Sequence, residues 1–511
     1  MQNNDKKVLL RISNLKQYFP LKGGRFVKAN DGITLDIYEG ETFGLVGESG
    51  CGKSTLGRTI LQLYHQTYGR TMYYGRSLDD LAPKYVIDTV KNLKARRTKL
   101  RELEQKRDKL EAEYAKLSEK EQYVKHGELD TARKLAEDAL LDITKIVGGF
   151  LVVDDLDPVI AAYSKDYAIA RKLSSMEEKR QELQVDVDDA EYAKKAAEEA
   201  GKSGKDDQLQ KAQEKLKQCD DQIAALRAQL DAGRKEIEAL RSPYANDPEF
   251  QKYEAYRDDG IDLARLEYNE MRRLRRDMQL IFQDPYSSLN PRMSVGQIIS
   301  EGMQAHNMIK KKDARMQEMV LKIMDDCGLA PYFLHRFPHQ FSGGQRQRIG
   351  IARALATKPK FVVCDEAVSA LDVSIQAQII NLLLDLKEQQ NLTYMFITHD
   401  LSVVKYISDR VGVMYLGTMV ELAAADEIFH HPIHPYTEAL LNAIPTTDTV
   451  GAKELSILEG DIPSPVNPPK GCKFHTRCKY CTEICTQVVP EWEEVRPNHF
   501  VACHHKLEAK E

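Results

Sequence analysis

A glycine-rich loop near the start of the chain has the residue types and spacing needed to hold phosphate groups. The segment from Gly47 to Ser54 reads GESGCGKS, fits the pattern G-x-x-x-x-G-K-[ST], and lies between the apolar run TFGLV and a helical pattern. Glycines let backbone amides at a helix start surround phosphate oxygens, Lys53 adds positive charge for the β- and γ-phosphates, and Ser54 offers a hydroxyl to Mg²⁺. The predicted nucleotide contacts are Gly47, Glu48, Ser49, Gly50, Cys51, Gly52, Lys53, Ser54 and Thr55.

Two neighbouring carboxylates follow a second apolar run. The segment FVVC is followed directly by Asp365 and Glu366. A buried strand of a parallel sheet delivers such residues to the sheet edge where ligands bind. Because the phosphate loop is also present, we expect Asp365 to hold Mg²⁺ through water. Glu366 is expected to act as the general base toward an attacking water.

A second anion-binding loop precedes another helical run. Ser342, Gly343, Gly344 and Gln345 stand just before the segment RQRIGIARALA. A Ser-Gly-Gly helix start presents backbone amides that have no partner within the helix, so it attracts negative charge. The chain already has a phosphate loop of its own. We therefore expect these four residues to bind a second ATP across a dimer interface.

The elements that position these motifs fall into stretches of different composition. Residues 1–75 and 259–445 alternate strand and helix patterns, whereas residues 76–258 are rich in Lys, Glu, Gln, Ala and Leu and poor in strand formers. Residues 446–511 carry a cluster of cysteines. The sequence thus predicts an α/β core in two parts, 1–75 and 259–445, an inserted helical arm at 76–258, and a Cys-rich extension at 446–511.

Heptad spacing in the inserted segment predicts an antiparallel coiled-coil hairpin. The apolar stretch IVGGFLVVDDLDPVIAAY would form its tip, and GKSGK at 201–205 a linker, because no strand precedes it. The alternative is a loosely ordered, solvated charge run. The first heptad series is Leu93, Leu100, Leu103, Leu110, Tyr114 and Leu117; the second is Leu209, Ala212, Leu216, Cys219, Ile223, Leu226, Leu230, Gly233, Ile237 and Leu240.

Composition excludes some classes of function. The net charge is −5 with 30% charged residues, and no basic excess indicates a nucleic-acid partner. The first residues lack the apolar core of a signal peptide, and no run of 18 or more apolar residues occurs, so we expect neither export nor a membrane span. Work at a membrane would then depend on partner proteins.

The order of these motifs resembles that of the ABC ATPases. The segment FSGGQRQR, which begins at Phe341, is similar to that family's signature motif, with phenylalanine where leucine is commonest. The resemblance implies a P-loop ABC ATPase cassette with a mixed sheet core and a helical subdomain, using ATP and Mg²⁺. It also implies roles for Gln283 in IFQDP as a Mg²⁺-sensing catalytic residue and for Asp372 in SALD as part of the loop that crosses the dimer.

Two further positions follow from the same resemblance. His399 in FITHD corresponds to the switch histidine that contacts the γ-phosphate and positions the catalytic base. Phe19, or its neighbour Tyr18, falls where the family stacks an aromatic ring on adenine; the alternative for either ring is a place in the core.

Other segments are similar to a narrower group, the ATPase subunits of oligopeptide/dipeptide importers, and particularly to the second of the two ATPase subunits in such systems. These are MQLIFQDPYSSLNPRMSVGQII, HPYTEALLNAIP and GDIPSPVNPPKGCKFHTRC. The resemblance implies ATP hydrolysis that powers peptide uptake at the cytoplasmic face of a membrane. It implies as partners two transmembrane permeases, a second homologous ATPase in a heterodimer and, indirectly, an extracellular solute-binding protein. Related importers carry nickel or other small solutes, so the solute stays open.

The C-terminal cysteines also fit this group. Cys472, Cys478, Cys485 and Cys503 resemble its terminal four-cysteine pattern, which implies a four-iron four-sulfur cluster or a zinc ion. Cys481 is additional to the pattern, and free thiols are the alternative.

An ABC ATPase with a long helical insertion has a rival interpretation, the coiled-coil ATPases of chromosome maintenance and DNA repair. In those proteins the coil generally separates the Q-loop from the signature motif, whereas here the insertion ends before Gln283. The insertion carries no Cys-x-x-Cys hook at the predicted tip. ABC-type translation factors would need two cassettes in one chain, and one is present. A transporter subunit is therefore the favoured reading.

Overall fold

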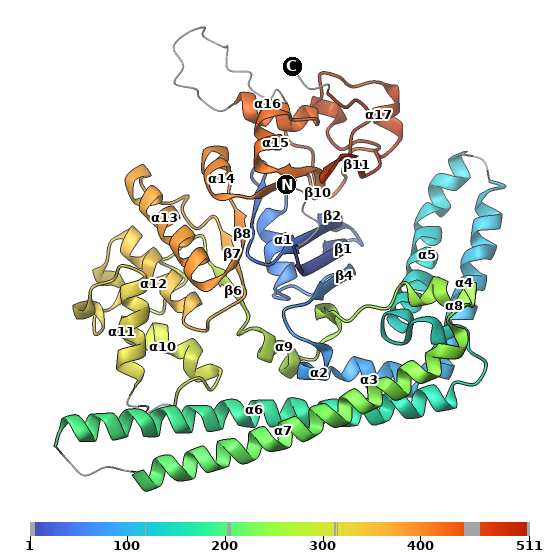
Figure 1. Ribbon diagram of the computed structural model, residues 1–511. Coiled ribbons are helices and arrows are strands. Elements are labelled where there is room, and N and C mark those ends of the chain that lie inside the picture. Colours follow the sequence, from blue (N-terminus) through green and yellow to red (C-terminus); the bar gives the residue numbers. More distant parts are fainter. Residues whose placement is uncertain are drawn as a thin grey trace. The chain divides into compact units, whose positions relative to one another are not determined.

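The strands of the chain form two sheets. The structure is a computed structural model that describes residues 6–117, 119–201, 206–310, 313, 315–443 and 460–507. The chain divides into two units: one contains residues 1–75, 262–264 and 271–511, the other residues 76–261 and 265–270. The second unit corresponds to the inserted arm that the sequence predicts at 76–258. Figure 1 shows both units with most of their helices and strands labelled.

The first unit is built on an eight-stranded sheet in the order β11-β12-β10-β9-β3-β8-β7-β6. The five strands from β9 to β6 in this order run parallel, and β10, β12 and β11 extend the sheet with antiparallel pairs. The strands are β3 (Thr42–Val46), β6 (Met278–Ile281), β7 (Phe361–Asp365), β8 (Thr393–Ile397), β9 (Arg410–Tyr415), β10 (Thr418–Ala424), β11 (Glu493–Arg496) and β12 (His499–Val501). Every residue of β3, β7 and β8 is buried, as expected of parallel strands covered on both faces.

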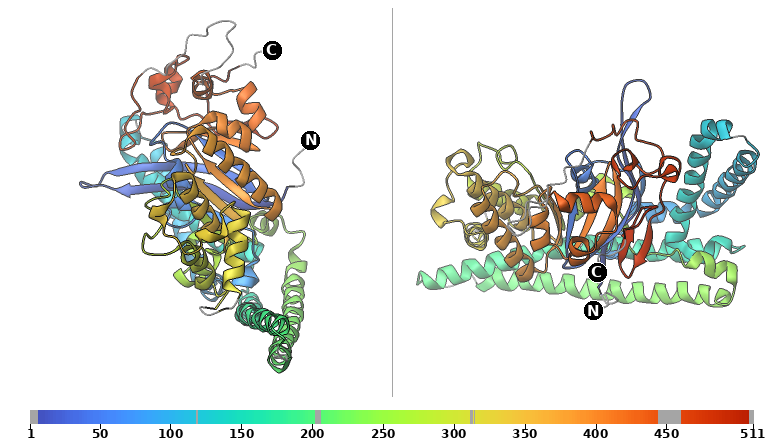
Figure 2. Two further views of the ribbon diagram at one scale, coloured as in Figure 1. Left: turned by 90° about the vertical axis from the view of Figure 1, so that its left-hand side faces the viewer. Right: turned by 90° about the horizontal axis from the view of Figure 1, so that it is seen from above.

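A second sheet has the order β2-β1-β4-β5. Its strands are β1 (Val8–Pro20), β2 (Phe26–Tyr38), β4 (Tyr68–Tyr73) and β5 (Ile261–Asp262). β1 pairs antiparallel with both β2 and β4, and β1 and β2 form a long hairpin that projects from the unit in Figure 2.

The helices of this unit pack beside the sheets and in a separate helical group. They are α1 (Lys53–Ile60), α10 (Val295–Ala305), α11 (Met316–Asp326), α12 (Gly343–Leu355), α13 (Val373–Gln390), α14 (Leu401–Ile407), α15 (Ala425–His430), α16 (Pro435–Asn442) and α17 (Glu483–Gln487). The residues of α9 (Tyr268–Leu274) are divided between the two units. α10, α11 and α12 pack on one another around Ile299, Met324 and Ile349, all fully buried. This group carries the Ser342–Gln345 loop at the start of α12.

The second unit is helical. Its elements are α2 (Leu78–Leu81), α3 (Lys84–Lys91), α4 (Leu93–Tyr114), α5 (Glu119–Val147), the 3₁₀ turn Gly148–Val152, α6 (Asp157–Glu199), α7 (Asp206–Arg241), the 3₁₀ turn Ser242–Tyr244 and α8 (Pro248–Glu254). α4 packs along α5, and α6 packs along α7 (Figures 1 and 2). With 43 and 36 residues, α6 and α7 are about 65 and 55 Å long.

The predicted pairing within this unit was wrong. The two heptad segments belong to α4 and α7, which do not pair with each other; each packs along its own sequence neighbour. Only a few residues join α4 to α5 and α6 to α7, and such short connections favour antiparallel neighbours. The apolar stretch expected at the tip instead lies in a core, where Phe150 and Leu156 are fully buried. The GKSGK linker falls largely outside the described residues.

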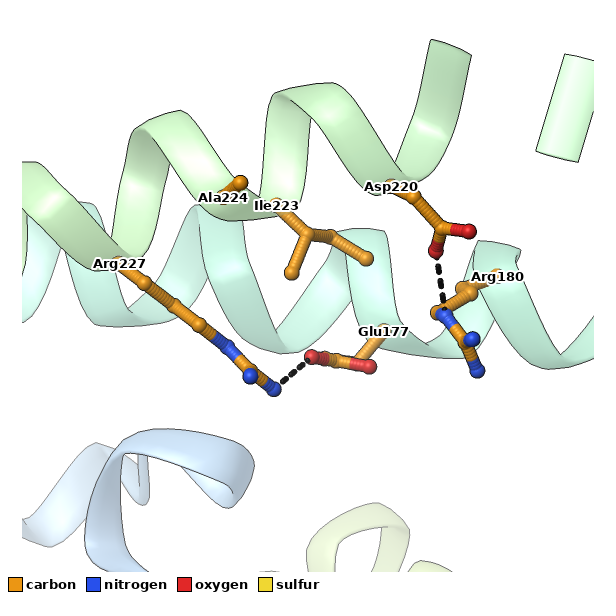
Figure 3. A pocket seen from close by; sticks show the side chains of 6 residues that line it. All are labelled: Glu177, Arg180, Asp220, Ile223, Ala224 and Arg227. Carbon is orange, nitrogen blue, oxygen red and sulfur yellow. Dashed lines mark hydrogen bonds and ion pairs between the residues drawn. The ribbon is translucent and has the colours of Figure 1, made fainter. Parts of the chain in front are cut away.

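The seam between α6 and α7 is apolar with charged pairs beside it. Cys219, Ile223 and Leu230 of α7 are buried, and Leu173 of α6 belongs to the same cluster. A depression in the seam, drawn in Figure 3, is lined by Glu177, Arg180, Asp220, Ile223, Ala224 and Arg227. Arg180 pairs with Asp220, and Arg227 with Glu177, both at 2.6 Å. These ion pairs link the two helices on either side of Ile223.

Candidate nucleotide site

The phosphate-binding loop joins β3 to α1. Gly47 and Gly52 have positive φ angles of 148° and 102°. A Cβ on Gly47 would lie 2.2 Å from the Met414 carbonyl oxygen, and one on Gly52 would lie 2.1 Å from that of Ala29. Both positions therefore require glycine for conformation and for space.

Lys53 is folded back over this loop. Its side chain is buried, and Nζ donates to the carbonyl oxygens of Gly47 at 2.7 Å and Glu48 at 3.1 Å. Both acceptors are neutral, so neither opposes the attraction between the ammonium group and an incoming phosphate. Cys51, also buried, lies 3.8 Å from Nζ, and burial raises the pKa of its thiol.

The loop borders a cavity of about 460 Å³. Its walls come from segments far apart in the sequence: Phe19, Val27, Lys28, Ala29, Ser49, Gly50, Gly52, Lys53, Ser54, Thr55, Gln283, Glu366, Leu416, Gly417 and Pro465. Phe19 borders this cavity and packs edge-on against Tyr64 at 5.3 Å. The hydroxyl of Tyr18, the alternative, donates instead to Asp31 at 2.5 Å.

The two acidic residues at the end of β7 point to different partners. Asp365 is 1% exposed; its Oδ1 accepts from the Ser54 hydroxyl at 2.5 Å, and its Oδ2 pairs with Arg58 at 3.1 Å. Two of the three residues predicted to hold Mg²⁺, Ser54 and Asp365, thus face each other. Hydroxyl and carboxylate oxygens are the donors that Mg²⁺ prefers, so this oxygen pair fits the ion.

Glu366 lies between the two other predicted catalytic residues, Gln283 and His399. Gln283 Nε2 donates to its Oε2 at 2.6 Å, and His399 Nδ1 lies 3.4 Å from its Oε1. Its backbone has a φ of 48°, and its amide donates to the Ile397 carbonyl at the end of β8. The left-handed backbone turns the side chain toward residues that follow β6 and β8.

The Ser342–Gln345 loop and Asp372 do not line this cavity. Ser342 caps α12, since its hydroxyl accepts from the Gln345 amide and its own amide donates to the Gln345 side chain at 3.1 Å. Ser342 and Gly343 are exposed. Asp372 is exposed too, and its carboxylate accepts from the Ile375 amide at the start of α13.

Two of the C-terminal cysteines, Cys472 and Cys478, pack against the core beside β9 and β10 of the eight-stranded sheet. The Cys472 amide donates to the Cys485 carbonyl at 2.8 Å. Burial raises the pKa of Cys472 to about 11 and that of Cys503 to about 12, although a backbone hydrogen bond to each thiol opposes the shift. Cys481 is exposed. Within the part of the chain that the structure describes, no three Cys, His, Asp or Glu side chains are close enough to form a set of metal ligands.

Several contributors to the site were not predicted from the sequence. Arg58 pairs with Asp365 one turn after Ser54 and could have been expected from helical spacing. Leu416, Gly417 and Pro465 reach the cavity through tertiary folding alone.

No described helix has both the length and the apolar character that crossing a membrane requires.

Comparison with known proteins agrees with the motifs. The family described as "ABC transporter" matches residues 30–251 and 250–369, and "Oligopeptide/dipeptide transporter, C-terminal region" matches residues 420–485. The Bacillus subtilis protein YkfD, described as an oligopeptide transport ATP-binding protein, is 34% identical over 97% of this chain and 95% of its own. The oligopeptide transport ATP-binding protein AppF of the same organism is 52% identical over 48% of this chain and 75% of its own.

The match to YkfD spans the inserted segment as well as the cassette. The chromosome-maintenance reading is not favoured, because these relatives are named for transport. The phosphate loop, the Asp-Glu strand end and the C-terminal region all agree with these matches. The chain therefore belongs to the ABC transporter ATPases, in the group of oligopeptide/dipeptide transport ATP-binding proteins.

Proposed function

We propose that the chain binds ATP in the cavity beside the phosphate loop and hydrolyses it when two ATPase subunits close on each other. Phe19 would stack on adenine, and residues 47–55 would hold the phosphates. Ser54, Gln283 and Asp365 would hold Mg²⁺, which neutralises phosphate charge when bound. Ser342, Gly343, Gly344 and Gln345, with Asp372, would contact the ATP of the partner subunit. The exposure of Ser342, Gly343 and Asp372 supports this assignment.

Glu366 would be the catalytic base. The observation that carries this proposal is its position between Gln283 at 2.6 Å and His399 at 3.4 Å, at the edge of the cavity. Glu366 would accept a proton from the attacking water, and Gln283 and His399 would orient its carboxylate.

Replacing the base tests this proposal. Glu366→Gln should keep ATP binding and reduce kcat by at least about a hundredfold, because the proton acceptor is lost while the phosphate loop remains. Lys53→Ala should weaken nucleotide binding itself. Glu388→Gln, an exposed substitution on α13, is the matched control and should hydrolyse ATP normally. Near-normal turnover by an assembled complex that contains Glu366→Gln would remove Glu366 from the role of base.

The transport partners are proposed from the relatives. The matched C-terminal region and the relatives' names support uptake of oligopeptides or dipeptides, powered by this subunit at the cytoplasmic face of a membrane. Two permeases and a second homologous ATPase, in a heterodimer, would complete the complex, and an extracellular binding protein would deliver the peptide. Peptide-loaded binding protein should stimulate ATP hydrolysis by the reconstituted complex; stimulation by a nickel-loaded one instead would reject the peptide substrate.

The remaining assignments concern the extension and the inserted arm. Cys472, Cys478, Cys485 and Cys503 would bind one metal centre, an iron–sulfur cluster or zinc, that holds the C-terminal extension (446–511) in place. The hydrogen bond from the Cys472 amide to the Cys485 carbonyl places two of these residues side by side, which supports a common site. Residues 76–258 would form an accessory coiled-coil arm between the two parts of the core, 1–75 and 259–445.

Metal analysis tests the cysteine site. Full-length protein purified without oxygen should contain iron and sulfide, or one zinc ion, in proportion to protein. Cys472→Ser should lose the metal, whereas Cys481→Ser, the matched control, should keep it. Folded, freshly reduced wild-type protein without either metal would leave the four residues as free thiols.

A further inference from the structure

Arg477 forms a two-pronged ion pair with Glu48 of the phosphate-binding loop. Nη1 lies 2.7 Å from Oε2 and Nη2 lies 3.0 Å from Oε1. The Arg477 side chain is only 4% exposed and that of Glu48 is 23% exposed. Paired hydrogen bonds between a guanidinium and a carboxylate fix both groups in orientation as well as in distance. A residue of the C-terminal region therefore holds the first turn of the loop.

Arg477 is itself held firmly by the fold. It ends the 3₁₀ turn His475–Arg477, and its amide donates to the Phe474 carbonyl at 3.0 Å. Phe474 is 2% exposed, and its ring centroid lies 5.2 Å from those of both Tyr415 and Tyr436. This aromatic cluster joins the turn to β9 and α16, so the guanidinium cannot follow a moving loop at low cost.

Glu48 is held at three points and touches the lysine that binds phosphate. Its amide donates to the Tyr436 hydroxyl at 3.0 Å, and its carboxylate receives Arg477. Its carbonyl accepts from Lys53 Nζ at 3.1 Å. Tyr436 and Arg477 both lie in the region 420–485, which matches the transporter C-terminal family. The position of Lys53 thus depends on two contacts that this region supplies.

We propose that Arg477 is a positioning residue for ATP binding: through Glu48 it holds the phosphate loop, and with it Lys53, in the nucleotide-binding conformation. The C-terminal region is then part of the nucleotide site and sets its affinity. A loop that is ordered before the ligand arrives loses less conformational entropy on binding. The inference rests on the proposed role of the loop in binding ATP.

The affinity of the full-length chain for MANT-ATP with Mg²⁺ tests the proposal. Arg477→Gln should raise the Kd about tenfold, the effect of losing one charge-assisted contact, while kcat at saturating ATP in the assembled complex changes less than about twofold. Glu48→Gln should have the same effect, and the double variant should be no worse than either single one. Arg477→Lys keeps the charge but loses the fork, so its Kd should be intermediate. Lys479→Gln is the control, since Lys479 pairs with Glu438 and not with Glu48, and its Kd should equal that of the wild type.

Different failures have different meanings. A wild-type Kd for Arg477→Gln beside a non-binding Lys53→Ala overturns the positioning role alone. Binding of MANT-ATP by Lys53→Ala as tight as wild type overturns the proposed nucleotide site. Additive losses in the Glu48→Gln and Arg477→Gln double variant would show two independent structural effects and would also overturn the proposal. Should Arg477→Gln fail to fold, a Kd of Arg477→Lys equal to the wild-type value has the same meaning.

Discussion

At the residue scale, Glu366 has a strained backbone, and its carboxylate contacts the side chains of Gln283 and His399. A φ of 48° is uncommon for a residue other than glycine and costs on the order of 1 kcal/mol or more. The surrounding fold maintains it, because the Glu366 amide bonds to Ile397 and its carbonyl accepts from the Ser369 hydroxyl. In this backbone conformation the carboxylate accepts a hydrogen bond from Gln283.

His434 makes the first unit sensitive to acid. The residue is 1% exposed, and its Nδ1 accepts from the Tyr436 amide, which requires an unprotonated ring nitrogen. Burial lowers its pKa from 6.5 to about 4, although the nearby Glu421 carboxylate opposes that shift. Between these two values the unfolded chain binds a proton and the folded chain does not. The free energy of unfolding should therefore fall as the pH drops from about 6.5 to about 4, by at most about 3 kcal/mol.

Urea unfolding followed by the fluorescence of Trp492, the only tryptophan of the chain, measures this slope. His434→Gln should flatten it across the window, and His335→Gln, at an exposed position, should keep it. A slope that is unchanged in His434→Gln would assign the acid sensitivity to another group.

At the element scale, the sequence predicted which face of a helix is buried better than which helix packs against that face. Four residues of the second heptad series, Cys219, Ile223, Leu230 and Ile237, are buried in the second unit. A heptad shows which side of a helix is apolar, but not which helix covers that side. The lengths of the connections decide that, and the charged helix α6 has little apolar periodicity by which its role could be recognised.

Asp166 is a weak point in the α6–α7 seam. It faces Gly233 of α7, where an added Cβ would lie 2.8 Å from Oδ1, and that oxygen has no hydrogen-bond partner among the described residues. Burial raises its pKa from 3.8 to about 6. A raised carboxyl pKa favours the folded state below pH 3.8, and that advantage is lost as the pH rises through about 6.

Asp166→Asn should therefore stabilise the arm at pH 7.5 by up to about 1 kcal/mol, a value reduced for the part of the carboxylate that water still screens. Near pH 4 the variant and the wild type should unfold alike. Hydrogen exchange of amides in α6 and α7 measures the local effect, with the exposed substitution Asp231→Asn as the control. Equal protection of wild type and Asp166→Asn at pH 7.5 would mean that the carboxylate is not strained in the seam.

At the scale of the whole molecule, the nucleotide cavity is made of residues from both ends of the chain. Phe19 and Lys53 could be predicted because a short pattern or a family resemblance identifies them. Pro465 borders the cavity and Arg477 holds the loop, yet no local pattern marks either residue. Long-range placement of this kind depends on how β9, β10 and the C-terminal strands pack, which periodicity does not encode.

The inserted arm should be removable without loss of the chemistry. The second unit has a core of its own, in which Val147, Phe150, Leu156 and Phe250 are 0–1% exposed. In the first unit the chain leaves after Gly75 and returns at Asp262, and Asp262 forms a buried ion pair with Arg70 at 2.7 Å. Because β4 and β5 are neighbours in one sheet, a short linker can join these ends.

Replacing residues 77–260 with a short Gly/Ser linker should therefore leave soluble protein that binds ATP and hydrolyses it within about twofold of the full-length rate in the assembled complex. The residues of the cavity all belong to the first unit, so none is removed. Lys53→Ala in the shortened chain is the control and should lose nucleotide binding. That loss would show that the ATP binding and hydrolysis measured come from the shortened chain itself. What should change is a contact with another protein, detected as a lost partner in cross-linking of the complex. A shortened chain that folds and binds ATP but cannot hydrolyse it, even with its permeases, would make the arm part of the catalytic machinery.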